Sequence, residues 1–425
     1  MKKNLRFSFL ALLPLLGSCT DFNDATLLSQ SDNTTAQKNI RSVDDAIAIA
    51  ASYANTGNVK SRTDRHAVAS TVTTVYSSKK GRSADDVLYY VVNYDDNQGF
   101  AVVGAPLCVP ELIAITESGT YNDPENVKNE SFHFAMDAVG TYVEAMAINP
   151  PDGPDIPIPI DTTNAVEKRP FETKIGPHVK VNWNQGWPEN MYAPNNIAGC
   201  YPVALAQALT YLRPFTELQL TFEGREKDVL DINWDEITKH FWSGNSYVLS
   251  QADKDYHYQY CPMESELHAD LGSLVRQCGQ ITGTTYDIKE GRTYTIPTTA
   301  DINLYPYLGM NYAGNGTTGL VYKLGTDGVG LMISSGETSH VWLVDGYSEI
   351  GYYLIVKGVG ESGNDEISKF SKYYLHYNWG FAGDSNGYFL EDVFDVSKAY
   401  RYDYAGNKGD VEYTGVSHVV YHPKK

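Results

Sequence analysis

The hydrophobic and polar pattern of the first third of the chain predicts a small α+β unit. Helical and strand periods alternate along it, and the expected elements are a helix at 43–54, strands at 87–93, 99–104 and 112–116, and a second helix at about 132–147. Ser42, with Asp45 three positions later, forms a capping-box pattern at the start of the first helix. The polar residues 95–98 supply turn chemistry between the first two strands. We therefore expect a separate domain over residues 42–149.

The pattern changes at a proline-rich segment. Seven of the 19 prolines lie between residues 150 and 177, where they force extended backbone and disfavour a helix or a central strand. We expect residues 150–177 to be a flexible activation linker, in which the basic residues Lys168, Arg169 and Lys174 offer cleavage sites to a protease. All six tryptophans lie beyond this segment. A second, larger domain is therefore expected over residues 178–425.

The N-terminus has the organisation of an export signal. The basic residues Lys2 and Lys3 precede an apolar run at 7–16, and small residues follow before Cys19. The run is about ten residues long, which is too short for the roughly 20 residues that cross a bilayer as a helix. The sequence Leu-Gly-Ser-Cys at 16–19 resembles the lipobox of bacterial lipoproteins, in which a peptidase cuts before a lipid-modified cysteine.

This lipobox resemblance implies a location for the protein. Residues 1–18 would be a lipoprotein signal peptide, a lipid on Cys19 would bind the membrane, and residues 19–41 would form a polar tether. The protein would be exported from a bacterial cell and reside as an outer-membrane lipoprotein or at the cell surface, with release after processing. An ordinary secretory signal with an incidental cysteine is the alternative.

Composition and charge exclude some classes of partner and site. The chain carries 33 Lys and Arg against 52 Asp and Glu, a net charge of -19, so nucleic acid would be repelled and is not an expected partner. Thirty-two tyrosines and 36 glycines describe a globular, β-rich protein. The five cysteines show no ligand spacing for a structural zinc ion. Either a disulfide between Cys261 and Cys278 or two free thiols is compatible with the sequence.

The most specific local feature is a glycine turn that leads into a helix ending near residue 212. Cys200 lies at the N-terminus of this helix, and Pro202 suits its first turn, where a missing N–H costs little. The helix dipole and the unpaired N–H groups favour a thiolate, so we expect the pKa of Cys200 to lie below the usual value of about 8.5. Taken alone, the pattern also fits a small buried cysteine with no chemical role.

A thiolate nucleophile needs a histidine that can hold a proton and deliver it to a leaving group. His340 opens a strand pattern at 340–347 between glycine-containing loops and is the strongest candidate. His376 is its main rival, but it precedes Asn378 by two residues and would share its strand. We expect Asn378 to orient the imidazole and Trp379 to cover that hydrogen bond. The chain order Cys, His, Asn is that of papain-like enzymes.

Together these segments resemble the streptopain family of papain-like cysteine proteases. The matching stretches begin at Gly199-Cys200, Ser339-His340, Asn378-Trp379-Gly380 and Gly387-Tyr388, and a Trp-x-Gln segment lies at 183–185. The resemblance implies that the side chain of Gln185 donates to the oxyanion hole. The N-terminal domain resembles the family's propeptide in the stretches 90–93, 99–103 and 113–119. The resemblance runs from about residue 40 to about residue 395.

The resemblance implies a fold, an activity and partners. The fold class is α+β: a papain-like fold whose helical part carries Cys200 and whose antiparallel β part carries His340, preceded by a small α+β pro-domain. The activity is that of a secreted or envelope-anchored cysteine endopeptidase, made as a latent zymogen. It would act on protein or peptide substrates, with its own pro-domain as intramolecular inhibitor. The catalytic set would be Cys200, His340, Asn378, Gln185 and Trp379, and acyl transfer through a thioester on Cys200 needs no metal or cofactor.

Three alternatives stay open on the sequence. They are a papain-like amidase acting on peptidoglycan stem peptides, a catalytically inert lipoprotein used for adhesion, and an N-terminal domain that inhibits other proteases. Some positions also depart from the family. Residues 378–383 are Asn-Trp-Gly-Phe-Ala-Gly, where the family usually has Asn-Trp-Gly-Trp-Gly-Gly, and Tyr201-Pro202 replaces smaller residues. These changes alter the substrate cleft, so side-chain specificity is not carried over.

Overall fold

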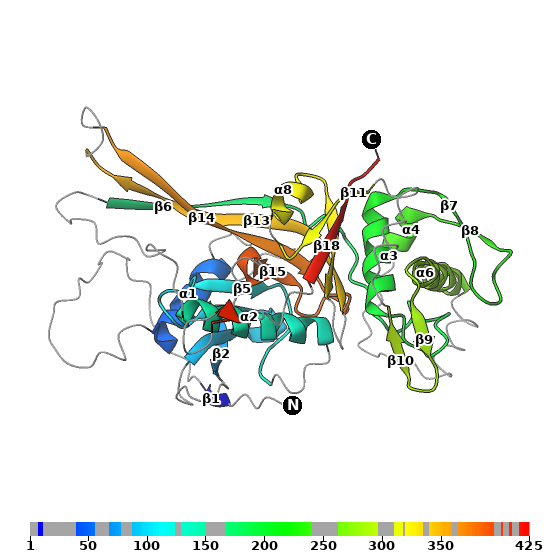
Figure 1. Cartoon of the computed structure of the whole chain (residues 1–425), viewed down its shortest axis with the longest axis horizontal. Coiled ribbons are helices and arrows are strands. Elements are labelled where there is room, and N and C mark those ends of the chain that lie inside the picture. The colour runs from blue at the N-terminus through cyan, green and yellow to red at the C-terminus, as the bar shows by residue number, and fades with distance from the viewer. Residues whose placement is uncertain are drawn as a thin grey trace.

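The described part of the chain forms an N-terminal α+β unit and a larger C-terminal unit that share one long sheet (Figure 1). The computed structural model describes residues 7–11, 40–55, 68–77, 87–123, 129–148, 166–239, 262–295, 310–317, 319–334, 340–358, 364–394, 401–402, 408–409 and 416–424. All the strand pairs in these residues are antiparallel.

The N-terminal unit has the elements that the sequence pattern predicts and one more. Its helices are α1 (Val43–Asn55) and α2 (Glu130–Ile148), and its strands are β2 (Ala69–Tyr76), β3 (Val87–Tyr94), β4 (Phe100–Gly104) and β5 (Leu112–Thr116). The capping box of α1 is confirmed, since Asp45 N–H donates to Ser42 Oγ at 3.1 Å and Ser42 N–H donates to Asp45 Oδ2 at 2.8 Å. Strand β2 escapes the pattern because serine and threonine separate its valines and weaken the hydrophobic signal.

The first strand falls in the expected signal peptide. β1 (Phe7–Ala11) pairs with β2 at the edge of the sheet and lies inside the apolar run near the N-terminus. Cys19 and the rest of the lipobox lie outside the described residues, so lipid attachment stays a prediction. None of the helices in the described ranges is both long and apolar enough to cross a membrane.

The C-terminal unit adds helices and the remaining strands. Its helices are α3 (Cys200–Leu212), α4 (Trp234–Lys239), α6 (Pro262–Ile281) and α8 (Leu320–Leu324). Its strands in the main sheet are β6 (Val166–Ile175), β11 (Met310–Asn315), β12 (Val329–Ser334), β13 (Val341–Val356), β14 (Glu366–Asn378), β15 (Gly387–Leu390) and β18 (Val416–Tyr421). Three hairpins stand apart: β7 (Glu217–Gln219) with β8 (Val229–Asp231), β9 (Thr285–Asp287) with β10 (Arg292–Tyr294), and β16 (Arg401–Tyr402) with β17 (Lys408–Gly409).

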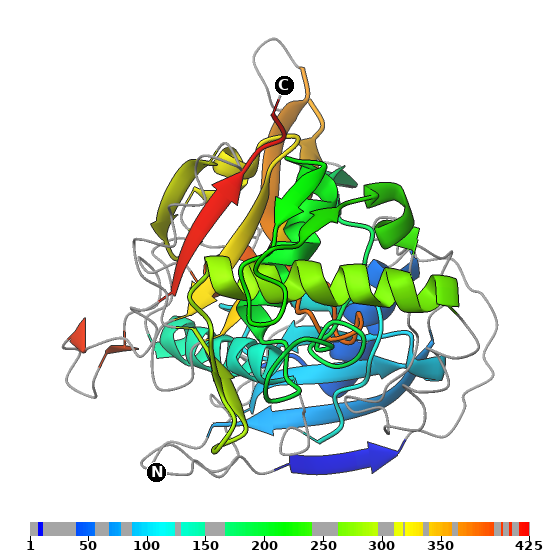
Figure 2. The ribbon, with the colours of Figure 1, turned by 90° about the vertical axis from the view of Figure 1, so that its right-hand side faces the viewer.

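A core between the sheet, α3 and α6 supports the helix that begins at Cys200. Helix α6 lies against α3 at the end of the molecule away from α1 (Figures 1 and 2). Leu205 and Leu209 of α3 are buried in one hydrophobic cluster with Leu274 and Val275 of α6. Burial of such side chains contributes about 2 kcal/mol each, so the position of α3 is set by packing on both sides.

The main sheet crosses the boundary between the two units. Its strand order is β1-β2-β3-β4-β5-β15-β14-β13-β12-β18-β11, so β5 of the N-terminal unit pairs directly with β15 of the C-terminal unit. In this pairing Ile115 lies opposite Tyr388, and Ala114 opposite Phe389. A Cβ on Gly387 would collide with the carbonyl oxygen of Ile115, so the close approach of the two strands requires glycine there.

Part of the proline-rich segment is a strand rather than a flexible linker. β6 (Val166–Ile175) pairs with β13, and this pairing includes Lys168 and Arg169 of the expected cleavage site. β6 is an edge strand, where Pro170 need not donate to a further neighbour, so it is neither the helix nor the central strand that the prolines disfavour. β13 pairs with β12 only through its first four residues, and its later residues, from Tyr347 onward, pair with β6. Residues 149–165 lie outside the described residues.

Candidate active site

Cys200 is the first residue of α3, as the sequence predicts, and the turn before it sets its position. Gly199 has a φ of 94°, and a Cβ there would lie 2.7 Å from Thr293 Cγ2 of β10, so this turn needs glycine. Thr293 Oγ1 also donates to the carbonyl of Ile197 at 2.9 Å. The hairpin β9–β10 therefore fixes the chain immediately before α3.

His340 directly precedes β13, also as predicted, and the end of β12 holds it. The His340 N–H donates to Ser334 Oγ at 2.8 Å, and the Ser334 N–H donates to the His340 carbonyl at 2.8 Å. The N–H of Val341, the next residue, forms a hydrogen bond that favours the thiolate of Cys200. The structure thus brings the N-terminus of α3 and the start of β13 together.

The thiol of Cys200 is not activated in this form of the chain. Burial has the largest effect and raises its pKa, the N–H groups of Val341, Tyr201 and Cys200 lower it, and the carboxylate of Glu130 raises it. The resulting pKa lies above the ordinary value, so the expectation of a lowered pKa is wrong here. The helix N-terminus is present as predicted, but burial and a nearby negative charge outweigh it.

His340 is likewise favoured in its neutral form. Burial lowers the pKa of its imidazole, Glu130 raises it, and His133 lowers it. His340 Nε2 lies 3.8 Å from Glu130 Oε2, but the side chain of Glu130 is 81% exposed, so water screens the attraction. A raised pKa for the thiol and a lowered pKa for the imidazole both oppose a thiolate–imidazolium pair.

The expected orienting residue, Asn378, ends β14 and has other partners. Its Nδ2 donates to the Val181 carbonyl at 3.0 Å, and its Oδ1 accepts from the Gly380 N–H at 3.1 Å. No hydrogen bond links Asn378 to His340 in the part of the chain that is described. The orienting role of Asn378 therefore stays a prediction, and it requires a form of the protein in which His340 lies closer to Asn378.

Trp379 lies inside an aromatic cluster. It is 1% exposed, and its Nε1 donates to the Ser385 carbonyl at 2.8 Å. Its ring centre lies 5.5 Å from that of Trp342 and 5.2 Å from that of Phe389. These contacts make Trp379 a core residue, and its cover over a His340–Asn378 hydrogen bond stays a prediction.

Gln185, the expected oxyanion donor, lies in a turn that is tied to α3. Its carbonyl accepts from the Ala198 N–H at 3.0 Å, two residues before Cys200. The Trp183 N–H donates to Gln207 Oε1 of α3 at 3.0 Å. The backbone on both sides of Gln185 is therefore fixed relative to α3, and its own side chain is half-buried.

Two contributors to this site escape sequence reasoning. Gln207 is fully buried on α3 and supports the Gln185 turn through Trp183, and the only available signal is an amide in an otherwise apolar helical run. Glu130 acts on both Cys200 and His340 from another domain. An exposed acid in the first turn of a helix gives no sign of such a contact, because it also suits the helix dipole.

Comparison with known proteins places the segment that carries these residues in a family. Residues 180–389 match the model of the Peptidase C10 family. The chain belongs to the peptidase C10 family. This is the streptopain family, so the resemblance is confirmed, and the protein is a cysteine-type endopeptidase. Residues 37–143 match the Spi protease inhibitor model.

The two matches confirm the overall plan of this C10 peptidase. It is a latent zymogen, with a papain-like α+β fold preceded by an inhibitory α+β pro-domain. Among solved structures, a fragment of prointerpain A from Prevotella intermedia with a cysteine-to-alanine substitution is 18% identical, with a TM-score of 0.49. That match covers 81% of this chain and 96% of the other. Comparison with curated proteins gives no match.

The pro-domain of the C10 peptidase reaches the active site through the first turns of α2. Glu130 approaches His340 there, and two phenylalanines on the same stretch enter the catalytic domain. The Phe132 ring centre lies 6.1 Å from that of Trp379, and the Phe134 ring centre lies 6.0 Å from that of Trp342. Aromatic contacts therefore hold the helix in place, while Glu130 supplies the electrostatic effect.

Phe134→Ala is expected to weaken latency without removing a residue of the active site. Loss of this half-buried ring should weaken the binding of α2 to the catalytic domain by about 2 kcal/mol. The population of chains in which α2 has left Cys200 and His340 should then rise roughly thirtyfold. The measurement is the rate at which iodoacetamide alkylates Cys200 in the full chain, with Asp137→Ala, an exposed change on the same helix, as control. An alkylation rate equal to that of the wild type would contradict a docking role for Phe134.

A second pro-domain contact covers the loop after Trp379. The Glu117 N–H donates to the Asn386 carbonyl at 2.7 Å, and Ser118 Oγ donates to the Gly383 carbonyl at 2.7 Å. Gly383 belongs to the stretch that departs from the family pattern. The strand β5 and the residues after it therefore bind β15 and this loop as one continuous segment.

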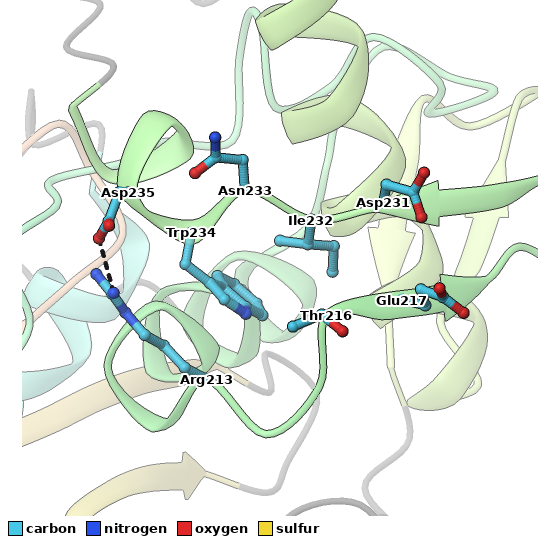
Figure 3. A pocket seen from close by; sticks show the side chains of 8 residues that line it. All are labelled: Arg213, Thr216, Glu217, Asp231, Ile232, Asn233, Trp234 and Asp235. Carbon is cyan, nitrogen blue, oxygen red and sulfur yellow. Dashed lines mark hydrogen bonds and ion pairs between the residues drawn. The ribbon is translucent and has the colours of Figure 1, made fainter.

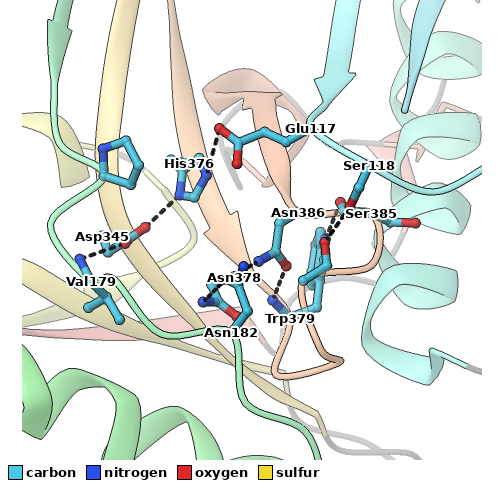
Figure 4. A network of polar contacts seen from close by, with 12 residues as sticks. Glu117, Ser118, Val179, Asn182, Asp345, His376, Asn378, Trp379, Ser385 and Asn386 are labelled. Atoms are coloured by element: carbon cyan, nitrogen blue, oxygen red, sulfur yellow. Dashed lines mark hydrogen bonds and ion pairs between the residues drawn. The ribbon is translucent and has the colours of Figure 1, made fainter. Parts of the chain in front are cut away.

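His376, the rival histidine, belongs to a buried ionic cluster between the two domains. Its Nδ1 lies 2.6 Å from Asp345 Oδ1, and its Nε2 lies 3.7 Å from Glu117 Oε1 of the pro-domain (Figure 4). Asp345 Oδ2 also accepts from the Val179 N–H at 3.0 Å. Burial lowers the pKa of His376, but Asp345 and Glu117 more than offset it and raise the pKa to about 9. His376 therefore links the two domains through Asp345 and Glu117.

His376→Gln is expected to change the pH dependence of stability of the latent chain. A pKa raised from 6.5 to about 9 contributes stability that is complete below pH 6.5 and is lost as the pH rises through about 9. The contribution is roughly 3 kcal/mol at full strength. The wild-type Tm should fall across this window, and the Tm of His376→Gln should start lower and change less. Parallel curves by calorimetry would contradict the assignment.

A cavity of about 470 Å³ lies away from this site (Figure 3). Its lining residues come from the end of α3, the β7–β8 hairpin and α4, and they include Arg213, Glu217, Asp231 and Trp234. Cys200 is at the opposite end of α3, so this cavity lies apart from the candidate catalytic residues. In the described ranges, no group of three or more His, Cys, Asp or Glu is placed to hold a metal ion.

Proposed function

We propose that this C10 endopeptidase cleaves peptide bonds by acyl transfer to Cys200, with His340 as base and acid. The observation that supports this most directly is the hydrogen bond from Val341, the residue after His340, which favours the Cys200 thiolate. The thiolate sulfur attacks the peptide carbonyl carbon, and His340 gives its proton to the amine as the C–N bond breaks. Water, deprotonated by His340, then releases the acid from the thioester and restores the thiol.

The negative oxygen of the tetrahedral intermediate needs preorganised donors. The Gln185 side-chain amide and the Cys200 N–H are the proposed donors, since the backbone bond from Ala198 to Gln185 ties these two segments together. Asn378 is proposed to orient His340 in the active form, with Trp379 packed beside it. In the latent chain Glu130 lies at His340, so this arrangement forms only after α2 leaves.

Latency is proposed to be both steric and electrostatic. The first turns of α2 occupy the approach to Cys200 and His340, and Glu130 raises the pKa of the thiol. Removal of the pro-domain exposes the site to water and removes this carboxylate. The N–H groups at the start of α3 then dominate, and the pKa of Cys200 falls.

The proposed location is the bacterial envelope, with the chain attached through a lipid on Cys19 until it is processed. A cut within 150–177 would separate the catalytic domain from this anchor and from the inhibitory domain. Lys168 and Arg169 lie in β6, so a protease must first open the β6–β13 pairing to reach them. A cut on the N-terminal side of β6 needs no such opening, and it would leave β6 with the catalytic domain.

Hydrolysis of a broad protein substrate tests this function. The full chain is incubated with casein before and after limited proteolysis, with and without prior alkylation by iodoacetamide. We expect no casein hydrolysis before proteolysis, hydrolysis after it, and complete loss of that hydrolysis on alkylation. Activity that survives alkylation would contradict a cysteine mechanism. Peptidoglycan stem peptides serve as the second substrate, because the amidase alternative predicts faster turnover of these than of casein.

A further inference from the structure

The turn that carries Gln185 is closed by a buried carboxyl group. Glu189 is 3% exposed, and its Oε1 accepts a hydrogen bond from the Asn184 N–H at 3.2 Å. Its other oxygen, Oε2, is buried with no hydrogen-bond partner among the described residues. Glutamate is rarely buried without a charged partner, so this group beside the oxyanion segment calls for a physical reason.

The neighbouring backbone groups show what the carboxyl group does. The Gly186 N–H donates to Asn184 Oδ1, and the Gly186 carbonyl accepts from the Asn190 N–H at 2.8 Å. The Gln185 carbonyl accepts from the Ala198 N–H. These bonds fix Gln185 on its C-terminal side. The N–H of Asn184 lies on the other side of Gln185, and Glu189 supplies its acceptor.

Glu189 is favoured in its neutral form. Burial raises its pKa to about 8, and the N–H groups of Glu189 and Asn184 lower it by less. A neutral carboxyl group can keep one oxygen as acceptor without the cost of a buried charge. At neutral pH the turn is therefore closed by an uncharged hydrogen bond.

Titratable groups approach the turn from two other elements. Arg225, between β7 and β8, donates through Nη1 to Tyr192 Oη at 3.1 Å, at the end of the turn. On α6, the His268 ring centre lies 5.7 Å from that of Trp187. Neither Arg225 nor His268 is among the groups that shift the pKa of Glu189. Its ionisation is therefore governed by burial and by the backbone of its own turn.

We propose that Glu189 is a positioning residue for the oxyanion hole: its buried carboxyl group accepts from the Asn184 N–H and so fixes the side chain of Gln185 relative to Cys200. This rests on the proposed role of Gln185 as an oxyanion donor. Ionisation of Glu189 places an unpaired charge in a buried turn, which admits water or expels the side chain and loosens the donor. A donor that is misplaced by about 1 Å loses much of its effect on the transition state.

The first test compares Glu189→Ala and Glu189→Gln in the full chain after activation by limited proteolysis. Glu189→Ala should lower kcat about tenfold and change KM by less than about twofold, because the donor acts on the transition state. Glu189→Gln keeps an acceptor oxygen and cannot ionise. It should retain most of the kcat at pH 7 and lack the fall in kcat that the wild type shows as the pH rises through about 8. An alkaline fall identical in wild type and Glu189→Gln would overturn the proposal.

A double-mutant cycle separates this proposal from the proposed function. If Glu189 acts through Gln185, Glu189→Ala should cost no further activity in a Gln185→Ala background. Independent, multiplicative losses would overturn the positioning role and leave Gln185 as an oxyanion donor. A wild-type kcat in Gln185→Ala alone would instead remove the oxyanion role, and the positioning role with it. Glu189→Gln has nearly the shape of the native side chain, so its result stands if Glu189→Ala folds poorly.

Discussion

Cys200→Ala is expected to abolish peptide-bond hydrolysis by the activated chain, with a loss of about 10⁴-fold or more in kcat. Alanine removes the sulfur that forms the thioester, and no other residue of the site can replace it. The position at the start of α3 tolerates alanine, which is a good helix former. The latent fold should therefore persist, with an unchanged Tm. The measurement is casein hydrolysis after limited proteolysis of wild type and variant.

Cys278→Ala is the matched control for this loss. Like Cys200, Cys278 is a free thiol of the catalytic domain with a raised pKa, but it is fully buried on α6 in the hydrophobic core. Cys278 is free among the described residues, and Cys261, the disulfide partner that the sequence allows, lies outside them. Replacement of Cys278 by alanine should leave a small cavity in the core, which lowers the free energy of unfolding, and it should leave kcat nearly unchanged. Comparable losses of kcat in the two variants would contradict the assignment of Cys200 as nucleophile.

Gln185→Ala is expected to lower kcat about a hundredfold or more and to leave KM nearly unchanged. Each preorganised donor of an oxyanion hole contributes about 3 to 4 kcal/mol to the transition state and little to the bound substrate. Steady-state kinetics on a short peptide substrate gives kcat and KM separately.

Gln219→Ala provides an amide control for this variant. Gln219 lies on β7, and its Nε2 donates to backbone carbonyls of its own hairpin, the closest being Asp228 at 2.8 Å. We expect its kcat to equal that of the wild type. A KM effect without a kcat effect in Gln185→Ala would mean that Gln185 binds substrate and does not stabilise the oxyanion.

Elements that depend on local chemistry could be predicted from the sequence. The capping box at Ser42 and the turn at 95–98 are short-range signals, and α1 and the β3–β4 hairpin follow from them. The glycine turn before Cys200 and the loop before His340 are equally local. The family motifs could therefore be recognised in one chain without coordinates.

Features that depend on distant contacts could not be predicted. The β5–β15 pairing joins residues that are about 270 positions apart, and the β6–β13 pairing places a strand in a proline-rich segment. The residues of a strand do not specify which distant strand will pair with it, so neither pairing leaves a local signal in the sequence. The same holds for the pKa of Cys200. The sequence predicts the helix N-terminus at Cys200, whereas the burial of Cys200 and the approach of Glu130 depend on the docked pro-domain.

The most direct test of latency is the pH dependence of Cys200 alkylation in the latent and the activated chain. Iodoacetamide is reacted with each form from pH 5 to pH 10, and the modified cysteine is identified by mass spectrometry of its peptide. The account predicts slow alkylation of the latent chain, with a rise that comes only at a higher pH than for an ordinary thiol, because the pKa of Cys200 is raised. It predicts that alkylation of the activated chain is faster and rises at a lower pH than that of the latent chain. Identical profiles for the two forms would contradict the claim that the pro-domain suppresses the nucleophile.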